Sequence, residues 1–264
     1  MALSNPAFST TPAFQQATRK KAAPTALELD ELYGRPSAGP AETERMGYDD
    51  VIIKTAVMFV ILLVGGVVGA IMPALALPAA LVGFVLALVN IFKKNPSPPL
   101  IIAYAAVEGV FLGGISFLLE SRFEGIILQA VMGTLIVTGV TLILFANGKV
   151  RASKRATKIF MIAGISYAAF SLINLGLQLT GINQDPWGLA SAPVFGIPLG
   201  LIIGPIAILM AAYSLVLDFT SIQQGVQAGV PRKLAWKAAF GLVLTIVWLY
   251  IEFLRLIAIL RGSN

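Results

Sequence analysis

The 264-residue sequence contains no cysteine and no histidine. The lack of cysteine excludes disulfides, thiolate metal sites and cysteine nucleophiles. The lack of histidine removes the usual proton carrier near neutral pH, the usual metal ligand and the base of a Ser-His-Asp triad. Any proton chemistry must therefore depend on carboxylates, lysines or tyrosines.

Charged residues are also scarce. They make up 12% of the chain, whereas about 25% is usual in a soluble domain. Hydrophobic residues reach 57% and the mean hydropathy is +0.85. Several segments contain the roughly 20 apolar residues that cross about 30 Å of hydrocarbon as a helix, and the alternating pattern of a barrel strand is absent. The sequence therefore predicts an all-α integral membrane protein.

Seven apolar segments are long enough to be spans, and Pro, Gly and charged residues separate them. They cover residues 51–72, 74–92, 99–119, 125–147, 157–180, 194–222 and 234–261. The first two are almost contiguous, which predicts a tight helical hairpin at Pro73. A seven-helix transmembrane domain over residues 47–264 is the expected organisation.

The first 46 residues differ from the rest of the chain. They are rich in Pro, Ala, Ser and Thr, and they contain a near-repeat, NPAF at 5–8 and TPAF at 11–14. Such a composition cannot bury enough apolar surface to offset the entropy lost on folding. We expect a disordered N-terminal tail.

Basic residues lie mostly on one side of the predicted spans. Sixteen of the nineteen Lys and Arg residues fall in the tail, at the start of the first span, or near 93–94, 149–158 and 232–237. Short cytoplasmic loops carry an excess of Lys and Arg. The pattern predicts a cytoplasmic N-terminus and an external C-terminus. It also accounts for the net charge of +6 without a nucleic-acid partner.

Four ionisable residues lie deep inside spans, away from the ends that carry the interfacial lysines, and a charge costs roughly 2.5 to 3.5 kcal/mol at the helix centre. They are Glu108, Asp218, Glu252 and Arg255. Glu252 has two candidate partners. Arg255 is three residues away on the same helix face, and Asp218 lies on the preceding span. Glu108 either lines a pathway or accepts hydrogen bonds within the bundle.

A pair formed by Asp218 and Glu252 would act as a proton switch. Two carboxylates about 4 Å apart repel by about 4 kcal/mol at an effective dielectric constant near 20. One of them would therefore hold a proton near neutrality, and the pair would separate when both ionise. After losing the proton, the two groups could instead bind a divalent cation such as calcium through carboxylate oxygens.

Several segments resemble the transmembrane Bax inhibitor motif family, whose bacterial members are the YccA-like proteins. SLVLDFTSIQQG (214–225) and WLYIEFLRLIAIL (248–260) resemble its last two helices. YDDVIIKTA (48–56) and AYAAVEGVFLGGIS (103–116) resemble its actinobacterial branch. The resemblance implies a seven-helix bundle with the C-terminal helix at its centre, in a bacterial cytoplasmic membrane.

The resemblance also implies a pH-sensitive calcium leak channel. Asp218 and Glu252 occupy the sensor positions, although the family pattern has aspartate where this chain has Glu252. Lys93 or Lys94 would take the place of a basic residue that contacts the pair. Calcium is the cation that the resemblance favours, other cations stay open as partners, and no cofactor is implied.

A second function stays open on the same resemblance. YccA-like relatives resemble substrates and modulators of a membrane protease, so the chain could be a non-transporting partner in a protease or stress-response pathway. An enzyme is not expected. The paired aspartates and GxGD context of an intramembrane aspartyl protease are missing from the sequence.

Overall fold

The computed structural model describes residues 45–183, 185 and 187–262. Within that part of the chain there are seven long helices, all long and apolar enough to cross a membrane. They are α4 (Tyr48–Ile71), α5 (Ala76–Phe92), α6 (Pro98–Glu120), α7 (Ile126–Ala146), α8 (Lys154–Leu179), α9 (Leu199–Gln227) and α10 (Ala235–Gly262). The predicted tail falls outside the described residues except for its last two positions, 45 and 46.

The outer surface of the bundle is apolar. Large hydrophobic side chains such as Leu63, Ile71 and Leu209 are mostly exposed along the helices. A face of this size and composition is stable against hydrocarbon and not against water. The predicted all-α integral membrane class is confirmed.

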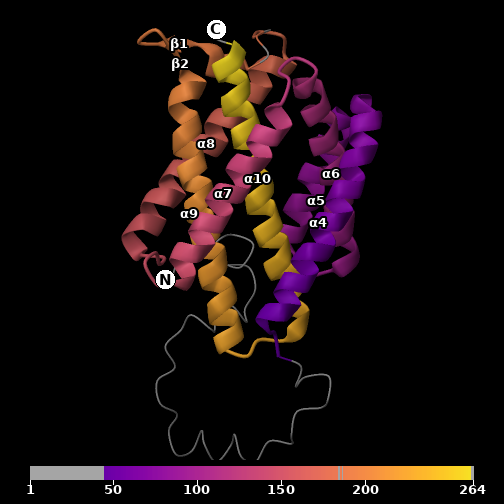
Figure 1. The fold of residues 1–264 in the computed structure, drawn as a ribbon, viewed down its shortest axis with the longest axis vertical. Coiled ribbons are helices and arrows are strands. Elements are labelled where there is room, and N and C mark those ends of the chain that lie inside the picture. Colours follow the sequence, from indigo (N-terminus) through magenta and orange to yellow (C-terminus); the bar gives the residue numbers. More distant parts are fainter. Residues whose placement is uncertain (1–44, 184, 186, 263–264) are drawn as a thin grey trace, which may run out of the picture.

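The C-terminal helix α10 runs through the middle of the bundle, as predicted. Figure 1 shows it in yellow, with α4, α5 and α6 on one side and α8 and α9 on the other. It packs against α9, α4, α7 and α6. Half of its length is buried, including Phe240, Val243 and Leu249.

Helices α4 and α6 make the most extensive contact in the bundle because glycines let their backbones approach. A Cβ atom at Gly69 would collide with the carbonyl of Val110, and one at Gly113 would collide with the carbonyl of Gly66. Gly69 follows Gly65 by four residues, and Gly113 follows Gly109 by the same spacing. Here the spacing serves helix packing.

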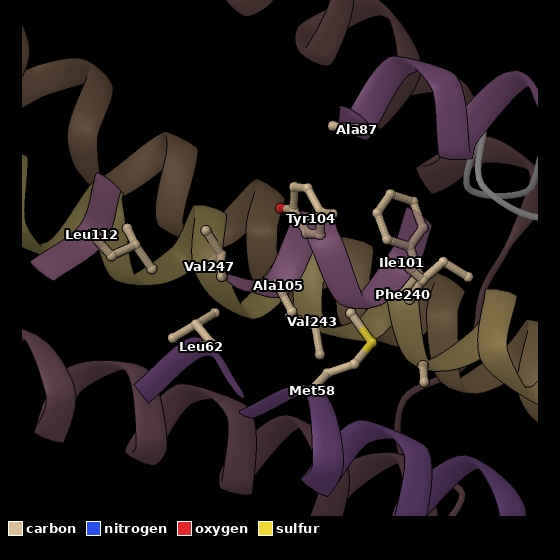
Figure 2. Packing of buried hydrophobic residues seen from close by; sticks show 11 residues of the cluster. Met58, Leu62, Ala87, Ile101, Tyr104, Ala105, Leu112, Phe240, Val243 and Val247 are labelled. Carbon is tan, nitrogen blue, oxygen red and sulfur yellow. The ribbon is translucent and has the colours of Figure 1, made fainter. Parts of the chain in front are cut away.

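A hydrophobic core joins α4, α6 and α10. Figure 2 shows Met58 and Leu62 of α4 meeting Tyr104 of α6 and Val243 of α10. The ring of Tyr104 meets Phe240 edge-on, with 5.1 Å between centroids. This core fixes the side of α6 that carries Glu108, four residues beyond Tyr104.

The first two helices form the predicted hairpin. A short 3-10 turn, Pro73–Leu75, follows the end of α4 and leads directly into α5. Proline suits this place because its missing N–H is not needed at the first position of a helix. The prediction of a tight connection at Pro73 is confirmed.

The sixth span begins later than predicted. Residues 194–198 belong to a small hairpin of β1 (Pro193–Val194) and β2 (Ile197–Pro198), so α9 starts at Leu199 and ends at Gln227. Phe195 and Gly196 form its turn with φ of 54° and 80°. Two successive positive φ values are typical of a tight hairpin turn and are incompatible with a helix. Hydropathy extended the predicted helix into this turn.

The chain before α4 is fastened to the α9–α10 connection. The N–H of Met46 donates to the carbonyl of Val230 at 2.7 Å. Asp50, in the first turn of α4, accepts from Arg232 at 2.6 Å. A 3-10 turn, Arg232–Leu234, then leads into α10. These contacts place the start of α4 and the start of α10 at the same end of the bundle.

Candidate functional site

A cavity of about 690 Å³ lies within the bundle. Residues of α5, α6, α8, α9 and α10 line it, and most of the lining is apolar. The polar side chains in its wall include Glu108, Tyr167, Ser214 and Thr245. The volume falls within the range of about 300 to 1,000 Å³ that small-molecule sites occupy.

Glu252 is buried on α10 and has three hydrogen-bond donors. The hydroxyl of Tyr167 on α8 and the indole N–H of Trp248 donate to its Oε1, the latter at 3.1 Å. Arg255 donates to its Oε2 at 2.6 Å. Both Tyr167 and Trp248 also line the cavity. The structure thus pairs Glu252 with Arg255, the local alternative, and joins it to α8.

Asp218 is fully buried on α9. The hydroxyl of Thr245 on α10 donates to its Oδ2 at 2.6 Å, and the hydroxyl of Ser214 lies 3.4 Å from that of Thr245. Thr245 and Ser214 line the cavity. Asp218 therefore lies directly behind the cavity wall.

The predicted contact between Asp218 and Glu252 is not made in this structure. Thr245, which binds Asp218, and Glu252 are seven residues apart on α10, or roughly 10 Å at 1.5 Å per residue. The donors to Glu252 are Tyr167, Trp248 and Arg255. Asp218 and Glu252 are apart because α10 presents Thr245 to Asp218 and carries Glu252 two helical turns farther along the bundle.

Glu108 of α6 lines the cavity directly. Its side chain is 8% exposed, and within the described residues it makes no hydrogen bond or ion pair. Ser116, a hydroxyl farther along α6, bonds to the hydroxyl of Tyr250 at 2.8 Å. Of the two alternatives for Glu108, the geometry favours a place on a cavity wall.

A comparison with protein-family models decides the classification. The model described as Bax inhibitor 1 like matches residues 5–262, which is nearly the whole chain. The chain belongs to the Bax inhibitor 1 like family. Family membership and the seven apolar helices together make it a multi-pass membrane protein. A search of curated proteins found no match.

In this Bax inhibitor 1 like protein, neither lysine expected to contact the acidic pair does so. Lys93 and Lys94 are exposed just beyond the end of α5. The buried basic residue at this end is Lys237 of α10. Its Nζ donates to the carbonyls of Ile91 and Lys93, at 3.3 and 2.9 Å. It thereby binds carbonyls at the C-terminal end of α5, where a cation is favourable.

Sequence reasoning missed four residues of this site: Tyr167, Trp248, Thr245 and Lys237. One of them had a local signal, since Trp248 precedes Glu252 by four residues and so shares its helix face. The other three contacts join different helices. They depend on how the helices are rotated against one another, which hydropathy does not report.

The described residues contain no group of three or more acidic side chains that could hold a metal ion. Asp218 and Glu252, predicted as possible calcium ligands, lie in separate hydrogen-bond networks and do not form a shared site. Calcium usually takes six to eight oxygen ligands. Neither carboxylate alone supplies such a ligand set.

Proposed function

We propose that this protein is a proton-sensitive cation leak pathway, with calcium among the ions it conducts. One observation carries the proposal: three buried carboxylates adjoin one cavity. Glu108 lines it, Asp218 is bonded to its wall through Thr245, and Glu252 is bonded to its wall through Tyr167 and Trp248. Rings and rows of carboxylates select cations in channels.

Protonation would act on the charge at the cavity. Arg255 balances the charge of Glu252, whereas Glu108 brings its carboxylate to the wall without such a partner in the described residues. The titratable side chains in the lining itself are Tyr104, Glu108 and Tyr167. When the carboxyls are protonated, the cavity loses its attraction for cations. Conductance should therefore rise as pH rises.

A liposome flux assay tests this proposal. We expect calcium efflux through the reconstituted protein to increase from mildly acidic to mildly alkaline pH. The variants Glu108→Gln and Asp218→Asn should lose most of that increase, because each removes a carboxylate that ionises. Glu252→Gln should reduce it too, since it leaves Arg255 as an uncompensated positive charge close to the cavity.

Glu124→Gln is the matched control, because Glu124 is exposed in the loop between α6 and α7. It should retain the pH dependence of the wild type. Equal pH-dependent flux in the wild type and all three cavity variants would reject the mechanism. A wild type without any flux would leave the chain with the role of a non-transporting membrane partner.

We also propose that the basic end of the bundle faces the cytoplasm of a bacterial cell, so that the C-terminus is external. The start of α4, the end of α5 and the start of α10 share one end through the Met46–Val230 and Lys237–Lys93 contacts. Basic residues gather in the connections at this end, as expected for a cytoplasmic side.

The absence of cysteine makes the orientation easy to test. Two single-cysteine variants report the two ends. Ala228→Cys labels the exposed α9–α10 connection at the basic end, and Ser121→Cys labels the exposed α6–α7 connection at the other end. In intact cells, a membrane-impermeant maleimide should label Cys at 121 and should label 228 only after lysis. The reverse pattern would overturn the orientation.

A further inference from the structure

The cavity carries more aromatic surface than the passage of a small inorganic ion requires. Six aromatic side chains line it: Phe84, Tyr104, Phe111, Phe160, Tyr167 and Trp248. Its volume of about 690 Å³ is many times the roughly 30 Å³ that one water molecule occupies in the liquid. Size and lining match a site for an organic molecule.

The acidic side chain in the lining of this aromatic cavity is Glu108, which makes the cavity negative when it is ionised. Glu108 is only 8% exposed, and it forms no hydrogen bond or ion pair among the described residues. The carboxylate also lies close to α5: a Cβ atom added at Gly83 would be 2.7 Å from Oε2 of Glu108, so the glycine leaves room for it there. An ionised buried carboxylate is costly unless a cation or donors accompany it.

The cavity wall includes side chains that face the outside of the bundle. Phe84 on α5 and Ile165 on α8 both line the cavity, and they are 57% and 67% exposed. In a membrane-spanning bundle, such exposed apolar side chains face lipid. The cavity therefore opens between α5 and α8 toward the hydrocarbon, where apolar ligands concentrate.

Helix α8 is the less firmly packed side of this opening. Among its described side chains, Thr157 near its start is the buried one. In the middle of the helix, Tyr167 fastens α8 to α10 through Glu252. A ligand can thus enter beside α8 without disturbing the α4, α6 and α10 core.

We propose that this cavity binds a lipophilic organic cation that enters from the bilayer, with its charge at Glu108 and its apolar body among the aromatic rings. Aromatic faces attract cations, and organic cations such as quaternary ammonium groups are recognised by aromatic cages. The carboxylate supplies the matching charge and excludes anions of the same shape. This site does not depend on cation conduction, since binding requires neither a gradient nor an open pathway.

Tetraphenylphosphonium and tetraphenylborate make a matched pair of probes, because they have nearly the same size and opposite charges. Binding is measured by equilibrium dialysis against the full-length protein in lipid nanodiscs, with empty nanodiscs subtracted. We expect saturable binding of tetraphenylphosphonium and none of tetraphenylborate. Glu108→Gln should weaken the binding at least about tenfold, and Glu124→Gln should leave it unchanged.

A second variant tests the location without altering charge. Ala168 lines the cavity from α8 and is exposed, so Ala168→Phe should fold and should fill part of the site. It should weaken binding of tetraphenylphosphonium as well. Equal affinity in the wild type, Glu108→Gln and Ala168→Phe would overturn the proposal, as would saturable binding of both probes alike. Binding without any calcium flux would support this site and reject the leak pathway, so the two failures are distinguishable.

Discussion

Replacing Arg255 with methionine should lower the free energy of unfolding by about 3 to 5 kcal/mol, because it leaves Glu252 buried without its cation. The Arg255 nitrogen lies 2.6 Å from Oε2 of Glu252, whose side chain is 3% exposed. The guanidinium also lies 5.5 Å from the ring centroid of Tyr167, so the substitution loses a cation–π contact too. Thermal and denaturant unfolding in detergent micelles measures the effect.

Combining Arg255→Met with Glu252→Gln should recover much of this loss, since the double variant no longer buries an unpaired charge. The same cycle between Glu252→Gln and Asp218→Asn should be close to additive, because these carboxylates do not touch in this structure. Arg122→Met, at an exposed arginine, controls for the substitution itself. A strong coupling of Glu252 with Asp218 and a weak one with Arg255 would contradict the observed pairing.

The fold was predictable from hydropathy because a span must be apolar over a length set by the bilayer. Seven spans, the hairpin at Pro73 and the class all follow from that constraint. The start of α9 was not predictable in the same way. Val194, Phe195 and Ile197 are apolar, yet the two positive φ values at 195 and 196 place them in a hairpin. Hydropathy is averaged over a long window, so it does not detect a turn that depends on the backbone angles of two residues.

The acidic residues of the site were predictable and their partners largely were not. A charge inside an apolar span is conspicuous, which identifies Glu108, Asp218 and Glu252 from their positions in the sequence. The partner of each carboxylate depends on its depth along the helix and on how the helices are rotated against one another. A shift of two turns along α10 separates Thr245, beside Asp218, from Glu252, beside Tyr167.

The burial of Lys237 and its partners were not predictable from the sequence either. Its place near the start of the last span, next to Trp236, is typical of a side chain at the membrane interface. The structure instead buries it to 1% exposure against the end of α5. The carbonyls at the C-terminal end of α5 need donors, and Lys237 supplies them from another helix. No pattern within α10 reports this requirement.

Replacing Thr245 with valine should lower the free energy of unfolding by roughly 1.5 to 3 kcal/mol, the usual value of a hydrogen bond to a charged group. Valine has nearly the same shape, so the change removes the donor to Asp218 together with the weaker contacts of the Thr245 hydroxyl with Ser214 and with the Gly241 carbonyl. That donor is 2.6 Å from Oδ2 of a carboxylate with no exposed surface. Thr134→Val is the matched control: Thr134 is also buried, and its hydroxyl donates to the Ala130 carbonyl of its own helix.

Thr245→Ser keeps the hydroxyl and should restore most of the stability that valine loses. Because Thr245 stands between Asp218 and the cavity, the valine variant should also alter the pH dependence of calcium flux, while the serine variant should not. If Thr245 had only a structural role, its variants would differ from the wild type in stability, but the pH dependence of calcium flux would stay the same. If Thr245→Val cost no more than Thr134→Val and left that profile unchanged, Asp218 would have no functional link to the cavity through α10.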